Sequence, residues 1–433
     1  MAQRLQPARR AFIRQAGALA AAGAAAPLWA ATHRDVVVLT AYPDAVVSRF
    51  EAAFEKAWPQ YRLRVVWRMP HDALPYLRQP GQGGVDVYWS ASPRTYAQLK
   101  AEKALRKLPV SLAGLPGRVG GSVIDDPDGY FAASEVAGYG FAVNPAYLAR
   151  EGLPVPADWT DLARPAFAGH LLVPDPVEVG FAPVLVDIPL QAYGWDNGWA
   201  LWSAIVANAR FVGRGGNFVS DEIGGGRSGV GLSIDFFVAA AIANGAPLDF
   251  VYPRQGGVNP AHVAVTAGSP NPAGARAFVG FILSEGGQRI LAHPDIRKLP
   301  VRPSVYAGLP AGYHNPFAVA EQGGYRYDNG RGRGRAAPVA AAFGQVFVQP
   351  RERLAGLWRR LRAADAATWN KAWPLLTAPP CAETEVDDAS VQQAFFARRD
   401  DPAAEARAGA LELEWAARAQ VRYTRAEALL GGA

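Results

Sequence analysis

Between residues 35 and 92, strand-like runs alternate with helical patterns at close spacing. The β-branched and aromatic residues that favour strands gather in DVVVLTAYP (35–43), YRLRVVWR (61–68) and VDVYWSAS (85–92). The segment from 44 to 58 has apolar residues at three-to-four spacing, as one buried face of a helix requires, and a second helix is expected near 72–79. Because strands joined by crossover helices pair in parallel, this pattern predicts an α/β fold built on a parallel sheet.

A long extended stretch, GYFAASEVAGYGFAVNP, interrupts the alternation at residues 129–145. No helical pattern follows it at once, so it can carry the chain from one lobe to another. The alternation then resumes in residues 146–252, and residues 259–268 resemble a strand that returns to the first lobe. We expect lobe 1 to contain residues 32–137 and 253–350, and lobe 2 to contain residues 138–252.

The remaining residues, 351–433, have a helical pattern and exceed what two lobes need. A break is expected at 376–385, and Asp401-Pro402 is a typical cap and first-turn pair for a final helix. Four tryptophans are available to pack on the lobes: Trp358, Trp369, Trp373 and Trp415. We expect a helical C-terminal extension that either braces the lobes or offers a docking surface to a membrane partner.

The first 31 residues have the composition of an export signal. They contain basic residues, an Ala/Gly-rich apolar stretch and small residues near Ala26 to Ala31, with no Asp or Glu. The pair Arg9-Arg10 is similar to a twin-arginine signal. We expect residues 1–31 to be a signal peptide and the mature protein to be periplasmic; the alternative is an Ala-rich helix. The single cysteine, Cys381, excludes an internal disulfide.

The net charge of +6 does not indicate a nucleic-acid partner. Four of the 44 basic residues lie in the first 31 positions, which leaves 40 basic against 38 acidic residues in the rest of the chain. The Gly/Arg-rich segment EQGGYRYDNGRGRGRAA (321–337) is short and isolated, so we interpret it as a solvated loop. We therefore expect no nucleic acid among the partners.

Motifs for catalysis or cofactor binding do not stand out. The string at 224–229 fits G-x-G-x-x-G, but a strand follows it where a dinucleotide site needs a helix. There is no G-x-S-x-G or H-E-x-x-H string, and the six histidines are scattered. A metal cluster or a Ser/His/acid set can still assemble in space, which leaves a secreted enzyme as an alternative. We expect a binding protein with no catalytic residues, no cofactor and no metal.

Small polar residues end several strands just before a helix. Examples are the strings at 40–43, 89–92 and 217–220. Helix N-termini carry free backbone N–H groups and partial positive charge, which suit a phosphate or a carboxylate. Ligands of open α/β sheets bind at the carboxyl ends of strands. These strings predict a cleft that binds an anion.

Five strings follow one another along the chain: VVVLTAYPDAVVSRFEAAFEKAWP, VDVYWSAS, AGYGFAVNP, VGLSIDFF and PNPAGARAFVGFILSEGGQRILA. In these strings and in the order of its elements, the chain resembles the periplasmic solute-binding proteins of ABC transporters, in the branch of ferric-ion, sugar-phosphate and phosphoglycerate binders. The resemblance implies a type II fold in which two α/β lobes joined by crossing strands close on a ligand in the interlobe cleft. It also implies a small solute and an ABC permease of the inner membrane as partners. We expect a monomer.

The resemblance gives the string SIDFF (233–237) a specific meaning. Ferric-ion members have two adjacent tyrosines after this strand, whereas this chain has Phe236-Phe237, and a phenyl ring cannot bind iron. Asp235 is therefore interpreted as a cleft residue that accepts hydrogen bonds from ligand hydroxyls or holds an arginine. The alternative, in which Asp235 caps the following helix, is compatible with that role.

The resemblance leads to an expected function and site. We expect capture of a small anionic, phosphorylated organic solute, with Arg68 or Arg214 as alternative charge partners. Other readings are a ferric-ion or other small-solute binder, and a sensing subunit that docks on a membrane receptor through its C-terminal helices. The candidate ligand-binding residues are Thr40, Ala41, Tyr42, Ser90, Ala91, Ser92, Ser134, Asp175, Asn217 and Asp235.

Overall fold

The computed structural model describes residues 33–213 and 216–431. The expected signal peptide at 1–31 and the candidate Arg214 lie outside these residues, and the side chain of Asn217 is not described. No helix in the described ranges combines the length and the apolar character that crossing a bilayer requires.

The first lobe contains the expected parallel sheet. Strand β1 pairs in parallel with β2 and β3, in the register Arg34↔Tyr61 and Val38↔Val87. The antiparallel strand β12 continues the sheet, so the strand order is β2-β1-β3-β12-β7. The elements are β1 (Arg34–Thr40), α1 (Asp44–Ala57), β2 (Tyr61–Trp67), α2 (Pro70–Leu77), β3 (Val87–Ser90), α3 (Pro93–Ala101), β4 (Leu105–Arg106), β12 (Val258–Thr266), α10 (Pro272–Leu283) and α11 (Glu285–Leu291). Helix α1 buries Val46, Val47, Phe50 and Phe54, the apolar face expected from the sequence.

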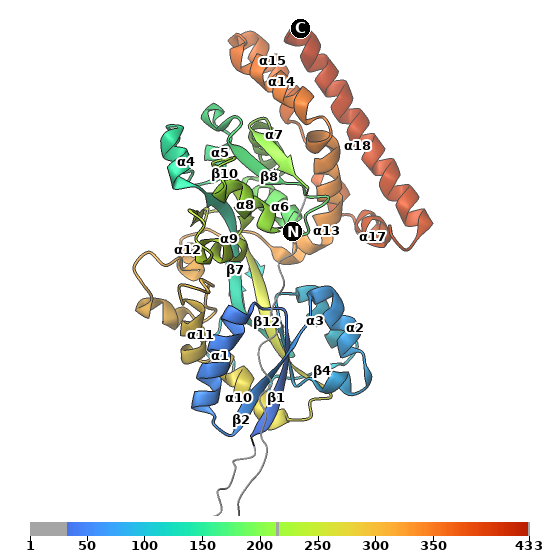
Figure 1. Ribbon diagram of the computed structural model, residues 1–433. Coiled ribbons are helices and arrows are strands. Elements are labelled where there is room, and N and C mark those ends of the chain that lie inside the picture. The colour runs from blue at the N-terminus through green and yellow to red at the C-terminus, as the bar shows by residue number, and fades with distance from the viewer. Residues whose placement is uncertain (1–32, 214–215, 432–433) are drawn as a thin grey trace, which may run out of the picture.

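Strand β7 (Phe131–Val143) connects the two lobes. Its first half pairs with β12, whereas Tyr139–Val143 pairs with β10 (Val230–Ile234). Strand β11 (Asp249–Val251) pairs with the opposite edge of that second half. Glycine is required here, because a Cβ on Gly138 would lie 2.6 Å from the ring of Tyr252. The expected crossing stretch is therefore a strand shared by both halves of one sheet (Figure 1).

The second lobe repeats the α/β arrangement around β10, β8 and β9. The G-x-G-x-x-G string begins at Gly224, the last residue of α8, and ends just before β10, so it opens no helix, as predicted. The elements are α4 (Pro145–Arg150), α5 (Trp159–Leu162), β8 (Leu171–Pro174), α6 (Ala182–Tyr193), α7 (Trp195–Val206), β9 (Ala209–Val212), α8 (Gly216–Gly224) and α9 (Asp235–Ala243). The segment that links the lobes adds β5 (Arg118–Val119), β6 (Ser122–Val123) and α12 (Pro316–Glu321).

The C-terminal helices pack on the second lobe (Figure 1). They are α13 (Asn329–Phe343), α14 (Arg351–Ala363), α15 (Ala366–Thr377), α16 (Glu383–Asp387), α17 (Ala389–Ala397) and α18 (Pro402–Leu429). One apolar core contains Trp199 and Trp202 of α7 together with Phe343 and Trp415. The packing differs from the expected boundary at residue 350, because Val339, Phe343 and Phe347 belong to the core of the second lobe. The predicted final helix does begin at Asp401-Pro402, where the Asp401 side chain accepts from Ala403 N at 2.9 Å.

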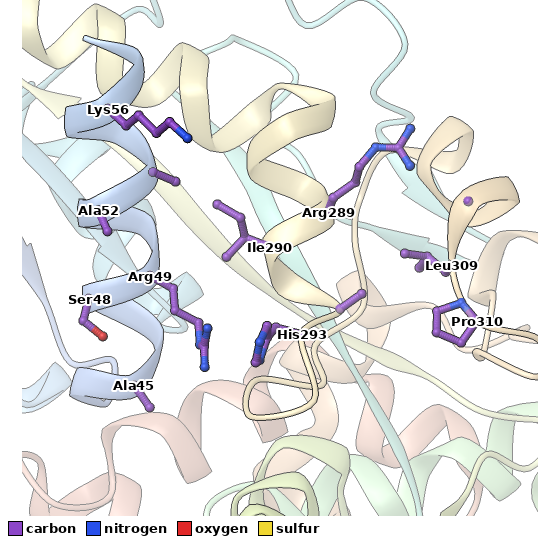
Figure 2. Close-up of a pocket in the computed structure, with 13 residues that line it drawn as sticks. Ala45, Ser48, Arg49, Ala52, Lys56, Arg289, Ile290, His293, Leu309 and Pro310 are labelled. Atoms are coloured by element: carbon purple, nitrogen blue, oxygen red, sulfur yellow. The ribbon is translucent and has the colours of Figure 1, made fainter. Parts of the chain in front are cut away.

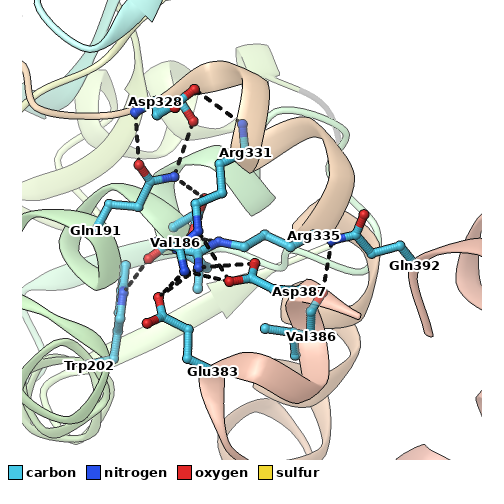
Figure 3. Close-up of polar contacts among 11 residues, drawn as sticks. Val186, Gln191, Trp202, Asp328, Arg331, Arg335, Glu383, Val386, Asp387 and Gln392 are labelled. Atoms are coloured by element: carbon cyan, nitrogen blue, oxygen red, sulfur yellow. Dashed lines mark hydrogen bonds and ion pairs between the residues drawn. The ribbon is translucent and has the colours of Figure 1, made fainter. Parts of the chain in front are cut away.

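The prediction of a solvated loop at 321–337 is wrong from residue 329 onward. Helix α13 forms there, and its residue Arg335 is 0% exposed. Its Nε donates to Asp187 Oδ1 at 2.8 Å and its Nη1 donates to Glu383 Oε1 at 2.8 Å, while Asp387 lies 3.6 Å away (Figure 3). A buried guanidinium is tolerated only with such partners, since an unpaired charge would be far more costly. The acids of α6 and α16 thus turn an arginine-rich segment into an internal helix.

Candidate ligand-binding site

The strands β1 and β3 end at the edge of the first lobe that faces the junction with the second. Thr40 and Ser90 are buried at these ends, Ala41 and Ser92 are partly exposed, and Ala91 is exposed. Helices α1 and α3 begin immediately afterwards, and no described side chain caps either N-terminus. The hydroxyl of Ser92 bonds to Thr95 Oγ1 at 2.8 Å instead. In these first turns Val46 N donates to Pro43 O and Thr95 N to Ser92 O, and Pro93 has no N–H, so only part of each helix end is available where the sequence predicted an anion site.

The side chains of Ser134 and Tyr42 also make contacts inside the protein. Trp89 Nε1 donates to Ser134 Oγ at 3.0 Å, and the Tyr42 ring lies 4.6 Å from the Trp89 ring. Thr40 Oγ1 accepts from Tyr42 N at 3.1 Å, which fixes the loop after β1. These contacts bring three candidate residues together and hold the Tyr42 hydroxyl towards strand β7.

A buried ion pair at the junction of the lobes was missed by the sequence reasoning. Glu135 on β7 accepts hydrogen bonds at Oε1 from Tyr42 Oη, at 2.9 Å, and from Lys298 Nζ. Glu135 is 2% exposed and Lys298 is 8% exposed. Burial and then the Glu135 carboxylate raise the pKa of the Tyr42 phenol, which stays protonated and donates. Among the described residues, Glu135 Oε2 has no hydrogen-bond partner.

Lys298 also connects the two lobes. Its Nζ lies 4.9 Å from the centroid of the Tyr42 ring, in the first lobe, and 5.4 Å from that of Phe236, at the start of α9 in the second. Phe236 packs against Phe237 at 4.1 Å, and Phe237 packs against Phe181 at 5.6 Å. An ammonium group held between two aromatic rings keeps unused N–H donors, because it has three and only one donates to Glu135.

Asp235 is the first residue of α9 and is 2% exposed. Its Oδ2 accepts from Gly138 N at 2.8 Å and from Tyr252 Oη at 3.0 Å, and its Oδ1 has no partner among the described residues. Burial raises the pKa of Asp235 to about 7, although the bond from Gly138 and the charge of Lys298 oppose this. The side chain therefore binds the crossing strand β7. It does not cap α9, because this helix has no side-chain cap.

A pocket of about 600 Å³ lies beside Asp235 on the side of the linking segment. Its wall includes Tyr252, Arg297, Tyr313 and His314. Tyr252 stacks on His314 at 3.8 Å, and burial lowers the pKa of His314 to about 4, so its imidazole is neutral near pH 7. The pocket thus combines one buried acid, one exposed arginine and flat aromatic faces.

The other candidate residues lie away from this cluster, or their side chains are not among those that the structure describes. Asp175 Oδ1 accepts from Val177 N at 2.8 Å and closes the turn after β8. Arg68 lies at the end of β2, exposed, with its guanidinium 4.9 Å from the Tyr76 ring. Asn217 is in α8, but its side chain is not described. Within the described ranges, no group of three or more His, Cys, Asp or Glu residues could hold a metal ion.

A family profile for bacterial extracellular solute-binding proteins matches residues 86–318. The chain belongs to this family. It is 30% identical over 273 residues to the phosphoglycerate transport regulatory protein PgtC of Salmonella typhimurium (strain LT2), an alignment that covers 63% of this chain and 68% of PgtC. The family model therefore identifies the chain as a bacterial extracellular solute-binding protein.

Solved structures share the fold. Fructose-6-phosphate-bound AfuA from Actinobacillus pleuropneumoniae matches with a TM-score of 0.52 at 17% identity, covering 72% of this chain and 98% of AfuA. Iron-bound HitA from Pseudomonas aeruginosa matches with a TM-score of 0.54 at 17% identity, covering 72% and 99%. These likenesses confirm the predicted type II periplasmic-binding-protein fold, here with a C-terminal helical region.

Proposed function

We propose that this protein captures a small phosphorylated organic solute in the interlobe cleft of the periplasmic protein and delivers it to an ABC permease of the inner membrane. The observation that carries the proposal is the arrangement of Lys298, Glu135 and Asp235 at the junction of the lobes. It provides one buried cation and two carboxyl groups, each with an oxygen that lacks a described partner.

Each part of that arrangement suits one part of such a solute. The free N–H donors of Lys298 and the uncapped ends of α1 and α3 suit a phosphate group. The unpartnered oxygens Glu135 Oε2 and Asp235 Oδ1 suit hydroxyl groups, because buried acceptors without donors are costly. Phe236 and Phe237 supply apolar walls and no iron ligand. The similarity to PgtC, whose name contains phosphoglycerate, supports the same substrate class.

Thermal unfolding of the mature protein against a solute panel tests this proposal. The panel should contain phosphate esters, phosphonates, dicarboxylates, polyamines and ferric citrate. A ligand at 100 times its dissociation constant adds about 2.7 kcal/mol to the stability of the folded state. Stabilisation by one phosphorylated class supports the proposal. Stabilisation by ferric citrate or a polyamine alone, or by nothing on the panel, would contradict it.

Export by the twin-arginine route, with cleavage of residues 1–31, is part of this proposal. The motif Arg9-Arg10 supports it. Replacing both arginines with lysine should hold the protein in the cytoplasm, which fractionation and immunoblotting would detect. Periplasmic delivery of the doubly substituted protein would contradict the route. We also propose that the protein is monomeric, which sedimentation would test.

A second candidate function is solute sensing for a membrane receptor. PgtC is named as a regulatory protein, and this chain has helices beyond the two lobes. Deleting those helices would be a poor test, because Trp415 and Tyr423 belong to the core of the second lobe. Leu413 and Val421 are exposed on α18, so Leu413→Glu with Val421→Glu is the better variant. If this variant loses a solute-dependent transcriptional response but keeps normal solute uptake, the result favours sensing. If it keeps both the response and the uptake, α18 is not the surface that contacts the receptor.

A further inference from the structure

A groove runs along helix α1 on the outer surface of the first lobe (Figure 2). Its volume is about 860 Å³. One wall is a single face of α1, where Ala45, Ser48 and Ala52 alternate with the longer side chains of Arg49 and Lys56. The opposite wall is formed by α11 and the turns after it. Small residues at this spacing leave room for another element to lie against α1 over about 16 Å, the length of the face from Ala45 to Lys56.

The walls of the groove are basic. Arg49 and Lys56 project from α1, and Arg289 and His293 project from the opposite wall (Figure 2). A Cβ on Gly308 would lie 2.5 Å from the guanidinium of Arg289, so this glycine lets the arginine cross the end of the groove.

Acidic residues compensate only part of this charge. Asp295 pairs with Arg49 and lies 3.5 Å from His293, and Glu285 lies 3.5 Å from Arg289. Lys56, on the same face of α1, has no ion-pair partner among the described residues. The uncompensated positive charge between α1 and α11 is therefore that of Lys56, beside a floor of alanine, isoleucine and proline side chains.

The groove also has a direct connection to the candidate ligand site. Helix α1 begins at Asp44, two positions after Tyr42, whose hydroxyl donates to Glu135 at 2.9 Å. The loop that carries Tyr42 thus lies at the end of the groove wall. An element bound in the groove would contact the same helix whose N-terminus we assign to the solute.

We infer that the groove binds an acidic amphipathic helix of the membrane protein that receives the solute. Glutamates along the flanks of that helix match Arg49, Lys56 and Arg289, and its small apolar face matches Ala45, Ser48 and Ala52. The inference rests on the proposed function for the identity of the partner. The binding chemistry of the groove is independent of which solute occupies the cleft.

A synthetic peptide tests the groove directly. The probe is a fluorescent helix of about 18 residues, about 27 Å long, with one alanine and leucine face flanked by glutamates. The matched peptide carries glutamine in place of every glutamate. Fluorescence anisotropy with the full mature chain should show binding of the glutamate peptide, at least tenfold weaker binding of the glutamine peptide, and weakening by added salt.

Two variants locate the binding. Arg49→Glu with Lys56→Glu should weaken peptide binding at least tenfold, and Ala52→Trp should do so by filling the groove without changing charge. The matched control is Arg64→Glu with Lys371→Glu, which reverses two exposed cations outside the groove and should leave binding unchanged. Equal binding by the Ala52→Trp protein, equal binding of both peptides, or a dissociation constant of the parent weaker than about 1 mM would overturn the inference.

The solute panel separates this result from the proposed function. If the parent binds the glutamate peptide but no solute stabilises it, the groove stands and the solute assignment fails. If a phosphorylated solute stabilises the parent and the groove variants equally but the parent does not bind the peptide, the solute assignment stands and the groove is wrong.

Discussion

Replacing Lys298 with methionine should strongly destabilise the protein, because the substitution leaves Glu135 as a buried carboxylate without its cation. Lys298 is 8% exposed and Glu135 is 2% exposed, so solvent screens the pair far less than it would screen a surface pair. Removing one member of a buried pair costs about 3–5 kcal/mol. The hydrogen bond from Tyr42 to Glu135 persists and does not supply a positive charge. We therefore expect the free energy of unfolding to fall by about 3–5 kcal/mol.

A double variant distinguishes the ion pair from the methylene groups of the lysine. In Lys298→Met with Glu135→Gln, both charges are absent and the Tyr42 hydroxyl can still donate to the amide oxygen. Replacement of a whole buried pair is often close to neutral, so we expect the double variant to recover most of the lost stability. Urea unfolding of the parent, both single variants and the double variant gives the coupling energy directly.

Solute binding then separates a structural role of Lys298 from a binding role. The folded double variant should bind the phosphorylated solute at least tenfold more weakly than the parent, by calorimetry, because the solute loses its buried cation. Arg64→Met, at an exposed site, is the control for loss of one positive charge. A loss of stability below about 1 kcal/mol in the single variant, the size of an exposed pair, would refute the burial argument. Unchanged solute affinity in the double variant would remove Lys298 from the site.

Three further predictions concern buried and exposed charges. The pKa of Asp235 in the folded state, about 7, lies above its unfolded value of about 3.9, so stability should rise as the pH falls from 8 to 5; Asp235→Asn should flatten this dependence in thermal unfolding. Arg335→Met should cost about 3–5 kcal/mol in urea unfolding by leaving Asp187 unpaired, and adding Asp187→Leu should restore most of it, whereas no recovery would contradict the pairing. The ring of Phe396 is 68% exposed and lies 5.5 Å from the guanidinium of Arg94, so Phe396→Ala should lower the free energy of unfolding, measured in urea, by less than about 1 kcal/mol. A larger loss would contradict the interpretation of this pair as a minor surface contact.

The elements of the first lobe could be predicted because their signals are local. The β-branched runs and the three-to-four spacing around Phe50 and Phe54 depend only on neighbouring residues, and the structure has β1, α1, β2 and β3 at the expected positions. The crossing stretch is visible for a related reason. Its apolar residues and glycines continue without a helical period, and strand β7 occupies Phe131–Val143.

The ion pairs could not be predicted because their partners are distant in the sequence. Glu135 is the only charged residue of β7, which is itself a signal that a buried cation is near. Nothing in the spacing identifies Lys298, which lies 163 positions away. The arginine-rich start of α13 was predicted to be a solvent-exposed loop for the same reason. Its local composition is polar, and the acids that neutralise Arg335 come from α6 and α16, which are distant in the sequence.

The orientation of Asp235 is a third example of this limit. Its place at the junction of β10 and α9 was visible in the sequence, but the direction of its carboxylate depends on Gly138 and Tyr252. These two residues come from the crossing strand and from the chain after β11. The sequence therefore indicated a residue at the junction of the lobes, and tertiary packing decided which atoms it binds.

The packing of the C-terminal helices constrains how closure of the cleft could be detected from outside. These helices share a core with the second lobe, so in a hinge rotation about β7 and β12 they move with that lobe. On the side of α3, Phe396 over Arg94 is a small, exposed contact between α17 and the first lobe, and it can break at little cost. The groove along α1 belongs entirely to the first lobe and its adjoining turns. A partner that contacts both the α1 groove and the outer face of α18 would therefore measure the separation of the lobes, whereas a partner of either surface alone would bind the open and closed forms equally.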